Sequence, residues 1–324
     1  MLDKFNMWKR TGKKEFQAMS ELCRTKLDTL RRLRIWRDYM KGNRVDETVE
    51  IVSLLQSNDD PYLDYLAQIF PTGEFENWTR CQQLLPFVEI AYNSVPATLR
   101  SWEAWAHIVT NVAWYLWAQG DYVVAQKMGI EALIVRERVL ELNDVRTLLS
   151  MEILAGVLSS QGNHSEAVKL NRRALEGYQK SLGLLHPFTL TSLSNLALVL
   201  QRMGNYKESE GLNRLVLKIS KIILGPRHTD TLTSMSNLAL VLQYQGKYRQ
   251  ATKLNQQALA GFQGVLGGRH PAVLTSMSNL AVLLQCQGKY KESEELYRQS
   301  LEGKVDELGW HHPSTLISVG MISR

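Results

Sequence analysis

The strongest constraint on the fold of this chain is an internal repeat with a period of 42 residues. The phrase HPFTLTSLSNLALVLQRMGNY returns with few changes in successive units, and more divergent copies precede it in the same frame. The unit begins at Trp102, Asp144, His186, His228 and His270, and an incomplete copy begins at His312. A fixed period of this length is typical of a solenoid, in which each unit buries its apolar face only against its neighbours.

Each unit contains two apolar stripes with helical spacing. In the fourth unit, Leu232, Leu238 and Leu242 lie three or four residues apart along one stripe, with further apolar residues between them. A second stripe follows Gly246 and ends at Gly267, a residue type that commonly terminates helices. The unit is therefore predicted to be a helical hairpin, and the fold class all-α.

Small residues recur in fixed register for steric reasons. Ala197 and Ala239 occupy a position where two helices are expected to cross closely, and Gly246 one where the chain must turn with positive φ. A tyrosine such as Tyr206 or Tyr248 follows the glycine, and we expect its ring to lie flat between the two helices. These positions indicate packing and not chemistry.

The succession Leu-Ala, Gly-x-Tyr-x-x-Ala and a further small residue resembles the tetratricopeptide repeat. The 42-residue period and the phrase HPxTLTSxSNLA are similar to its longer, kinesin-light-chain-like variety. The resemblance covers residues 102–324 and implies a right-handed solenoid. The segment FPTGEFENWTRCQQLLPFVE at 70–89 is similar to the region that joins an NB-ARC module to its repeats in fungal NLR-like proteins.

We expect three segments: a basic helical segment at 1–58, a degenerate hairpin or cap at 59–101, and the repeat array at 102–324. Residues 1–45 hold 13 Lys or Arg against 5 Asp or Glu, which accounts for more than the whole net charge of +6. This segment either packs as a solvated helix on the first repeat or binds nucleic acid or an anionic membrane.

Four tryptophans of the first repeat, including Trp102 and Trp105, are either binding anchors or the means of burying this repeat against a cap. The chain has no apolar signal core, and its three cysteines are far apart. A cytoplasmic protein is therefore expected.

The sequence offers little that could support catalysis, so we expect no enzyme activity, no cofactor and no small-molecule substrate. The string Thr11 to Lys14 lacks the upstream glycine and the hydroxyl of a phosphate-binding loop, so the nucleotide switch of an NB-ARC protein is expected to be missing. Histidines that are 42 residues apart cannot share one metal ion. They are better explained as turns that precede a helix, with proline at its start.

Mid-helix asparagines are the best functional candidates, because each costs a helix about 0.6 kcal/mol relative to alanine. In the family resembled, asparagines at this register lie on the concave face and bind the backbone of an extended peptide. A hydrogen bond between helices that sets the repeat curvature is the alternative. The predicted peptide-binding residues are Asn111, Asn195, Asn237, Asn279, Thr191, Thr233, Thr275, Gln201, Arg202, Gln243, Tyr244 and Gln285.

These residues predict a scaffold or sensor arm that binds a protein or an extended peptide on the concave face of the repeats. A kinesin-light-chain-like cargo adaptor is the alternative, as is nucleic-acid or membrane binding through the basic N-terminus. The nearly neutral groove disfavours the C-terminal carboxylates that basic clamps bind.

The last unit stops one helix short of a hairpin, so STLISVGMIS would expose an apolar stripe. It either lies over the fifth repeat as a cap or drives association between chains, and we expect weak self-association.

Overall fold

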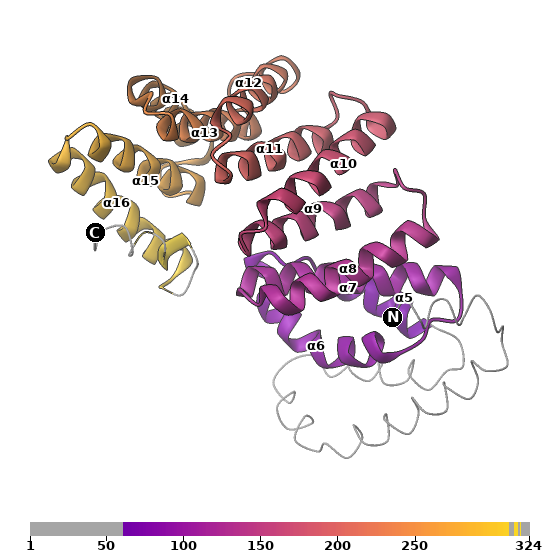
Figure 1. Cartoon of the computed structure of the whole chain (residues 1–324). Helices are drawn as coiled ribbons and strands as arrows, with labels where there is room; N and C mark the ends of the chain where they lie inside the picture. The colour runs from indigo at the N-terminus through magenta and orange to yellow at the C-terminus, as the bar shows by residue number, and fades with distance from the viewer. Residues whose placement is uncertain (1–60, 311–313, 317, 319–324) are drawn as a thin grey trace. The chain divides into compact units, whose positions relative to one another are not determined.

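The computed structural model describes residues 61–310, 314–316 and 318, and every regular element in this part of the chain is a helix (Figure 1). The all-α prediction is confirmed. The basic segment predicted at 1–58, with its nucleic-acid and membrane alternatives, lies outside the described residues. The helices are α5 (Pro61–Ile69), η2 (Phe75–Asn77), α6 (Trp78–Asn93), α7 (Leu99–Gln119), α8 (Tyr122–Val139), α9 (Val145–Ser160), α10 (His164–Leu182), α11 (Pro187–Arg202), α12 (Tyr206–Ile223), α13 (Thr229–Tyr244), α14 (Tyr248–Leu266), α15 (Pro271–Cys286) and α16 (Tyr290–Leu308).

The chain forms two compact units, Met1–Gly177 and Tyr178–Arg324, and α10 crosses the division between them. In the first unit α7 pairs with α8, which packs against α9, and α5 and α6 pack against α7. In the second unit, three consecutive hairpins, α11–α12, α13–α14 and α15–α16, pack in chain order (Figure 1). This succession is the hairpin solenoid that the repeat predicts.

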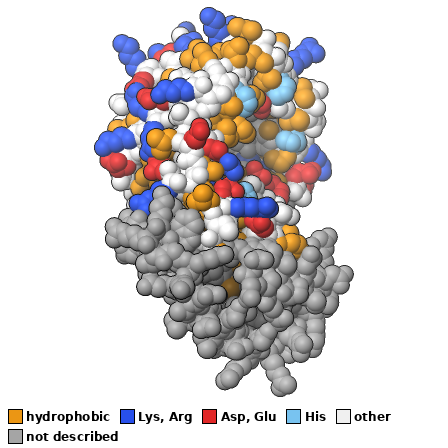
Figure 2. Space-filling model, turned by 90° about the vertical axis from the view of Figure 1, so that its right-hand side faces the viewer, with side chains coloured by type: hydrophobic (Ala, Val, Ile, Leu, Met, Phe, Trp, Pro, Cys, Tyr) orange, Lys and Arg blue, Asp and Glu red, His pale blue; other side chains and the backbone are white. Residues whose placement is uncertain are grey.

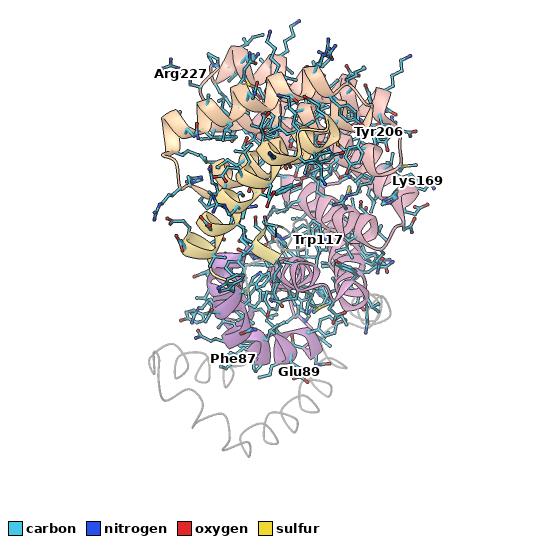
Figure 3. All side chains as sticks on the ribbon, turned by 90° about the vertical axis from the view of Figure 1, so that its left-hand side faces the viewer. Phe87, Glu89, Trp117, Lys169, Tyr206 and Arg227 are labelled. Carbon is cyan, nitrogen blue, oxygen red and sulfur yellow. The ribbon has the colours of Figure 1, made fainter. Side chains whose placement is uncertain are left out.

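Tryptophans build the interior of the first unit. The side chains of Trp102 and Trp105 on α7 are fully buried, and the Trp105 ring stacks on Tyr92 of α6 with centroids 5.9 Å apart. Trp117, labelled in Figure 3, donates its indole N–H to the Ser160 hydroxyl at 2.8 Å. Trp102 and Trp105 therefore bury the first repeat against the helices that precede it and are not exposed anchors.

Gly73 lies where the turn before α6 approaches α7. A Cβ atom at this position would be 2.4 Å from the backbone nitrogen of Tyr115, closer than any side chain can come. The Gly73 carbonyl also accepts a hydrogen bond from the indole N–H of Trp78 at 3.1 Å. This turn therefore needs glycine for space.

Small residues let the two helices of each hairpin cross closely in the second unit. Ala197, Ala239 and Ala281 on the first helices are at most 1% exposed, as expected. Facing them, the Ser209 and Ser293 hydroxyls donate to the carbonyls of Ala197 and Ala281 at 2.7 and 2.8 Å. The second helix is therefore hydrogen-bonded to the first at the crossing.

Histidine begins each first helix of the second unit, and its side chain accepts a hydrogen bond from a backbone N–H two residues later. The capped pairs are His186 with Phe188, His228 with Asp230, and His270 with Ala272, at 3.1–3.2 Å. Pro187 and Pro271 occupy the first turn of α11 and α15, which agrees with the predicted turns. Gly246 lies in the turn between α13 and α14 and has a φ of 74°, which is the positive value that the sequence predicts.

The repeat tyrosines, predicted to lie between the two helices, differ in their burial. Tyr122 and Tyr290 are 36% and 68% exposed, and Tyr206 and Tyr248 are half-buried. The small residue three positions later occupies the helix crossing instead, and this leaves the ring at the edge of the hairpin where the second helix begins. Tyr248 packs in part against the core of the second unit, whereas Tyr122 and Tyr290 lie at the surface.

The described part of the C-terminal segment lies against α16. Lys304, which is only 3% exposed, donates to the hydroxyls of Ser278 and Ser318 at 3.1 and 2.8 Å. The Thr315 hydroxyl donates to the Lys304 carbonyl at 3.5 Å. These contacts agree with a cap over the fifth repeat, and self-association remains a prediction.

Basic and acidic side chains are interspersed over the face drawn in Figure 2. Among the described helices, none combines the length and the apolar character that crossing a membrane requires.

Candidate functional site

The first helices of the three hairpins in the second unit are neighbours, because α13 packs against both α11 and α15. Each carries the same three-residue pattern at the predicted register. We call these nine side chains the first-helix ridge: Thr191, Asn195 and Leu198 on α11, Thr233, Asn237 and Leu240 on α13, and Thr275, Asn279 and Val282 on α15.

The three kinds of ridge residue differ in their exposure. The threonines are exposed, whereas Asn195, Asn237 and Asn279 are half-buried. Leu198 is 42% exposed although it is a large apolar side chain. The ridge thus offers hydroxyl, amide and apolar groups, and none of the nine side chains is ionisable.

A small pocket of about 100 Å³ opens between α11, α12 and α13. It brings together three residues predicted to bind the peptide, Asn195, Gln201 and Asn237, and four that were not predicted. Its lining consists of Ser194, Asn195, Leu198, Gln201, Asn213, Asn237 and Leu240. The pocket can hold a small side chain between two leucines and several amides, but it is too small for a cofactor.

The remaining predicted residues do not all join this pocket. Gln201 is 8% exposed and lines it, whereas Gln243 is half-buried and Gln285 is exposed. Arg202 is exposed, and the Tyr244 ring stacks on Tyr206 of α12 with centroids 5.7 Å apart. Tyr244 therefore faces the start of a second helix.

In the first repeat, the residues at the ridge positions make contacts within the protein. Asn111 is 4% exposed and donates to the Phe70 carbonyl at 3.3 Å. His107, one turn earlier, lies 3.4 Å from the guanidinium of Arg136, which is 1% exposed and donates to the Ser150 hydroxyl. Burial, followed by the Arg136 charge, lowers the pKa of His107. Asn111 is therefore far less accessible than the asparagines of the second unit.

A second series of asparagines, on the second helices, was missed from the sequence. Asn171, Asn213 and Asn255 are at most 4% exposed, and Asn213 lines the pocket while donating to the Ser209 carbonyl at 3.0 Å. The signal was present in the recurring phrases LNRRAL, LNRLVL and LNQQAL. The series is hard to recognise in the sequence, because these asparagines interrupt an otherwise apolar stripe.

The described residues contain no group of three His, Cys, Asp or Glu side chains arranged to hold a metal ion. The histidines His186, His228 and His270 each cap a different helix.

Solved structures with a similar fold include kinesin light chain-like TPR repeats from Podosopora anserina, 25% identical in sequence. That similarity covers 64% of this chain and 95% of the other, with a TM-score of 0.52. BtubC from P. vanneervenii is 16% identical over 79% of this chain and 95% of its own, with a TM-score of 0.55. NprR in complex with its cognate peptide NprX is 13% identical over 96% and 85%, with a TM-score of 0.60. The last two similarities concern the fold alone.

No curated protein sequence matches the chain. The tetratricopeptide repeat family model matches residues 103–180, 188–264 and 237–304, which together make up more than half of the sequence. The chain belongs to the tetratricopeptide repeat family.

Proposed function

We propose that this protein is an interaction scaffold that binds an extended peptide segment of a partner protein along the first-helix ridge. The observation that carries the proposal is the pocket between α11, α12 and α13, where Asn195 and Asn237 meet Leu198 and Leu240. Repeat proteins of this family offer such successive helix faces as binding surfaces. Binding rather than catalysis is the function that we expect.

The chemistry of the ridge favours a peptide backbone as the ligand. An amide side chain can donate to a backbone carbonyl and accept from a backbone N–H at the same time. The repetition of asparagine on α11, α13 and α15 offers such pairs at regular intervals, as an extended chain requires. Leu198 and Leu240 would flank one small side chain of the ligand in the pocket.

The alternative role of the asparagines, which is to fix the contact between neighbouring repeats, is compatible with binding. Asn195 also interacts with a neighbour within the protein. A purely structural role predicts that alanine substitution changes stability and leaves peptide affinity unchanged. A binding role predicts the opposite, so the two roles can be separated by measurement.

Two more specific assignments rest on different resemblances. The 25% identity to kinesin light chain-like TPR repeats favours a cargo adaptor of that type. The segment at 70–89 instead favours the recognition arm of a fungal NLR-like protein, and here it forms the turn and the helix α6 that pack on α7. Both assignments share a peptide-binding array.

The test begins with selection of peptides from a random library on the full chain, followed by calorimetry of the enriched peptide. We expect the Asn195→Ala, Asn237→Ala double variant to bind at least about tenfold more weakly, because two amide partners are lost. Asn205→Ala is the matched control: Asn205 is exposed and makes no capping hydrogen bond. Equal affinities of the parent and the double variant would refute the assigned residues.

Salt provides a second readout on the same peptide. Because the ridge carries no ionisable side chain, affinity should change little between low and high salt. A steep loss of affinity with salt would instead indicate phosphate or carboxylate contacts and favour the basic segment at 1–58.

A further inference from the structure

The edge of the second unit where the second helices begin differs from one repeat to the next. At the start of α12, Tyr206, labelled in Figure 3, is covered by the Tyr244 ring of α13. The two rings are almost parallel, with an interplanar angle of 10°. Here an aromatic side chain of the next repeat occupies the face of the repeat tyrosine.

One repeat later, 42 residues along, Tyr248 takes the place of Tyr206 and Cys286 takes the place of Tyr244. Cys286 is exposed and carries no ring that could cover Tyr248. The surface has a depression of about 590 Å³ at this place, lined by Gly246, Lys247, Tyr248, Arg249, Gln250, Cys286 and Gln287. This volume lies in the range of pockets that hold small ligands, so an aromatic side chain can fit.

A second substitution at the same edge changes its charge. Glu210 on α12 accepts hydrogen bonds from Lys247, the residue that precedes α14, at 2.9 Å and from Arg214 of its own helix at 2.8 Å. The hydrogen bond from Lys247 is the main cause that lowers the pKa of Glu210 to about 2. Its equivalent one repeat later is Thr252, which accepts a hydrogen bond from Gln287 at 2.7 Å. The edge at Tyr248 thus has no counterpart of the Tyr244 ring and no counterpart of the Glu210 carboxylate.

We propose that the depression over Tyr248 binds an aromatic side chain of a partner polypeptide that is followed by an acidic residue. A polypeptide is the fitting occupant, because in the neighbouring repeat the equivalent face is occupied by a tyrosine of the chain itself. The acidic preference follows from Arg249, because the lining holds no carboxylate and its other cation, Lys247, is already paired with Glu210. The site lies at the hairpin edge, apart from the first-helix ridge, and does not depend on the function proposed for that ridge.

The thiol of Cys286 allows a direct test by reversible disulfide exchange. In a Cys23→Ser background, the chain is equilibrated with the mixed disulfides that 2-mercaptoethanol forms with the acetylated peptide amides Cys-Gly-Tyr-Asp, Cys-Gly-Leu-Asp and Cys-Gly-Tyr-Asn, so that the Cys286 thiolate takes up the peptide and releases 2-mercaptoethanol. Increasing 2-mercaptoethanol then displaces them, and intact mass reports the labelled fraction. Cys81 is buried, so Cys286→Ser should abolish labelling.

Stacking on Tyr248 should make the Tyr-Asp peptide resist roughly 2- to 10-fold more reductant than the Leu-Asp peptide. Tyr248→Leu should remove this advantage. Tyr290→Leu, which alters the same register one repeat later at a ring that is 68% exposed and outside the depression, should preserve it.

Equal retention of the Tyr-Asp and Leu-Asp peptides by the parent would overturn the aromatic site, as would an advantage that survives Tyr248→Leu. Equal retention of the Tyr-Asp and Tyr-Asn peptides would overturn the acidic preference. Failure of the ridge variants to affect peptide binding would leave this result unchanged, because the two sites use different side chains.

Discussion

The first repeat fills one repeat position differently from the repeats that follow it. Residues at this position lie 42 residues or a multiple apart and are all fully buried: Trp105 in the first repeat, then Thr147, Thr189, Thr231 and Val273. In the first repeat a large ring occupies this position, because α5 and α6 must be joined to the array. In the later repeats, on both sides of the division between the units, a smaller side chain is enough. The repeat thus determines where burial occurs, while the neighbouring helices determine the size of the residue.

The largest loss of stability should come from removing the Trp105 ring, which only the first repeat has at this position. Trp105→Ala deletes a fully buried indole that stacks on Tyr92, and we expect a loss of about 3–5 kcal/mol in the free energy of unfolding of this unit. Chemical denaturation followed by tryptophan fluorescence and by circular dichroism would measure it. A loss below about 1 kcal/mol would mean that α6 is not an integral part of the first unit.

One glycine in each unit tests whether the absence of a side chain is needed for close packing of the backbone. Gly73→Ala should cost about 3 kcal/mol, because the new Cβ atom would meet the backbone of α7. Gly211→Ala lies within α12 with no atom nearby and should stabilise the second unit by up to about 1 kcal/mol. Changes of the same sign in thermal unfolding would contradict this contrast.

The buried Lys304 should destabilise the end of the second unit at neutral pH. Burial lowers its pKa from 10.5 to about 8. Neither α15 nor residues 314–316 and 318 carry a charged side chain, and Asp306 and Glu307 on α16 are exposed. Lys304→Met should therefore add about 2 kcal/mol of stability at pH 7, whereas the exposed Lys291→Met should change little.

The sign of the pH dependence follows from the same lysine. Between about pH 8 and 10.5 the unfolded chain binds the proton that folded Lys304 has lost, so stability should rise with pH across this window. The rise should be smaller in Lys304→Met. Identical pH profiles of the two proteins in urea titrations would show that Lys304 is not buried in solution.

The smallest change in stability is expected at Thr189 and Thr231, the buried threonines that occupy the repeat position of Trp105. The Thr231 hydroxyl has no hydrogen-bond partner, whereas the Thr189 hydroxyl donates to the Gly183 carbonyl at 2.7 Å. Thr231→Val should stabilise by about 1 kcal/mol and Thr189→Val should destabilise by a similar amount. Equal responses in denaturant titrations would remove this distinction between repeats.

The repeat itself allowed the hairpins, their limits and the close alanine crossings to be predicted, because local periodicity and sterics determine them. It also predicted Asn195, Asn237 and Gln201 at one surface, and these three residues line the pocket between α11, α12 and α13. The turn at Gly73 and the stacking of Trp105 on Tyr92 could not be predicted, since they depend on contacts between segments that do not repeat. The exposure of Tyr122 and Tyr290 could not be predicted, because a small residue three positions later, and not the ring, fills the helix crossing.

The proposed function requires that the face of α11 and α13 around Asn195 and Leu198 binds the peptide. The most direct test places one charge on that face, by measuring the affinity of the selected peptide for Leu198→Arg and for Leu215→Arg. The two leucines are similarly exposed, at 42% and 37%, but only Leu198 lines the pocket. We predict that Leu198→Arg weakens binding at least about tenfold while Leu215→Arg retains the affinity of the parent. Unchanged affinity in Leu198→Arg, or equal losses in both variants, would show that this face does not bind the peptide.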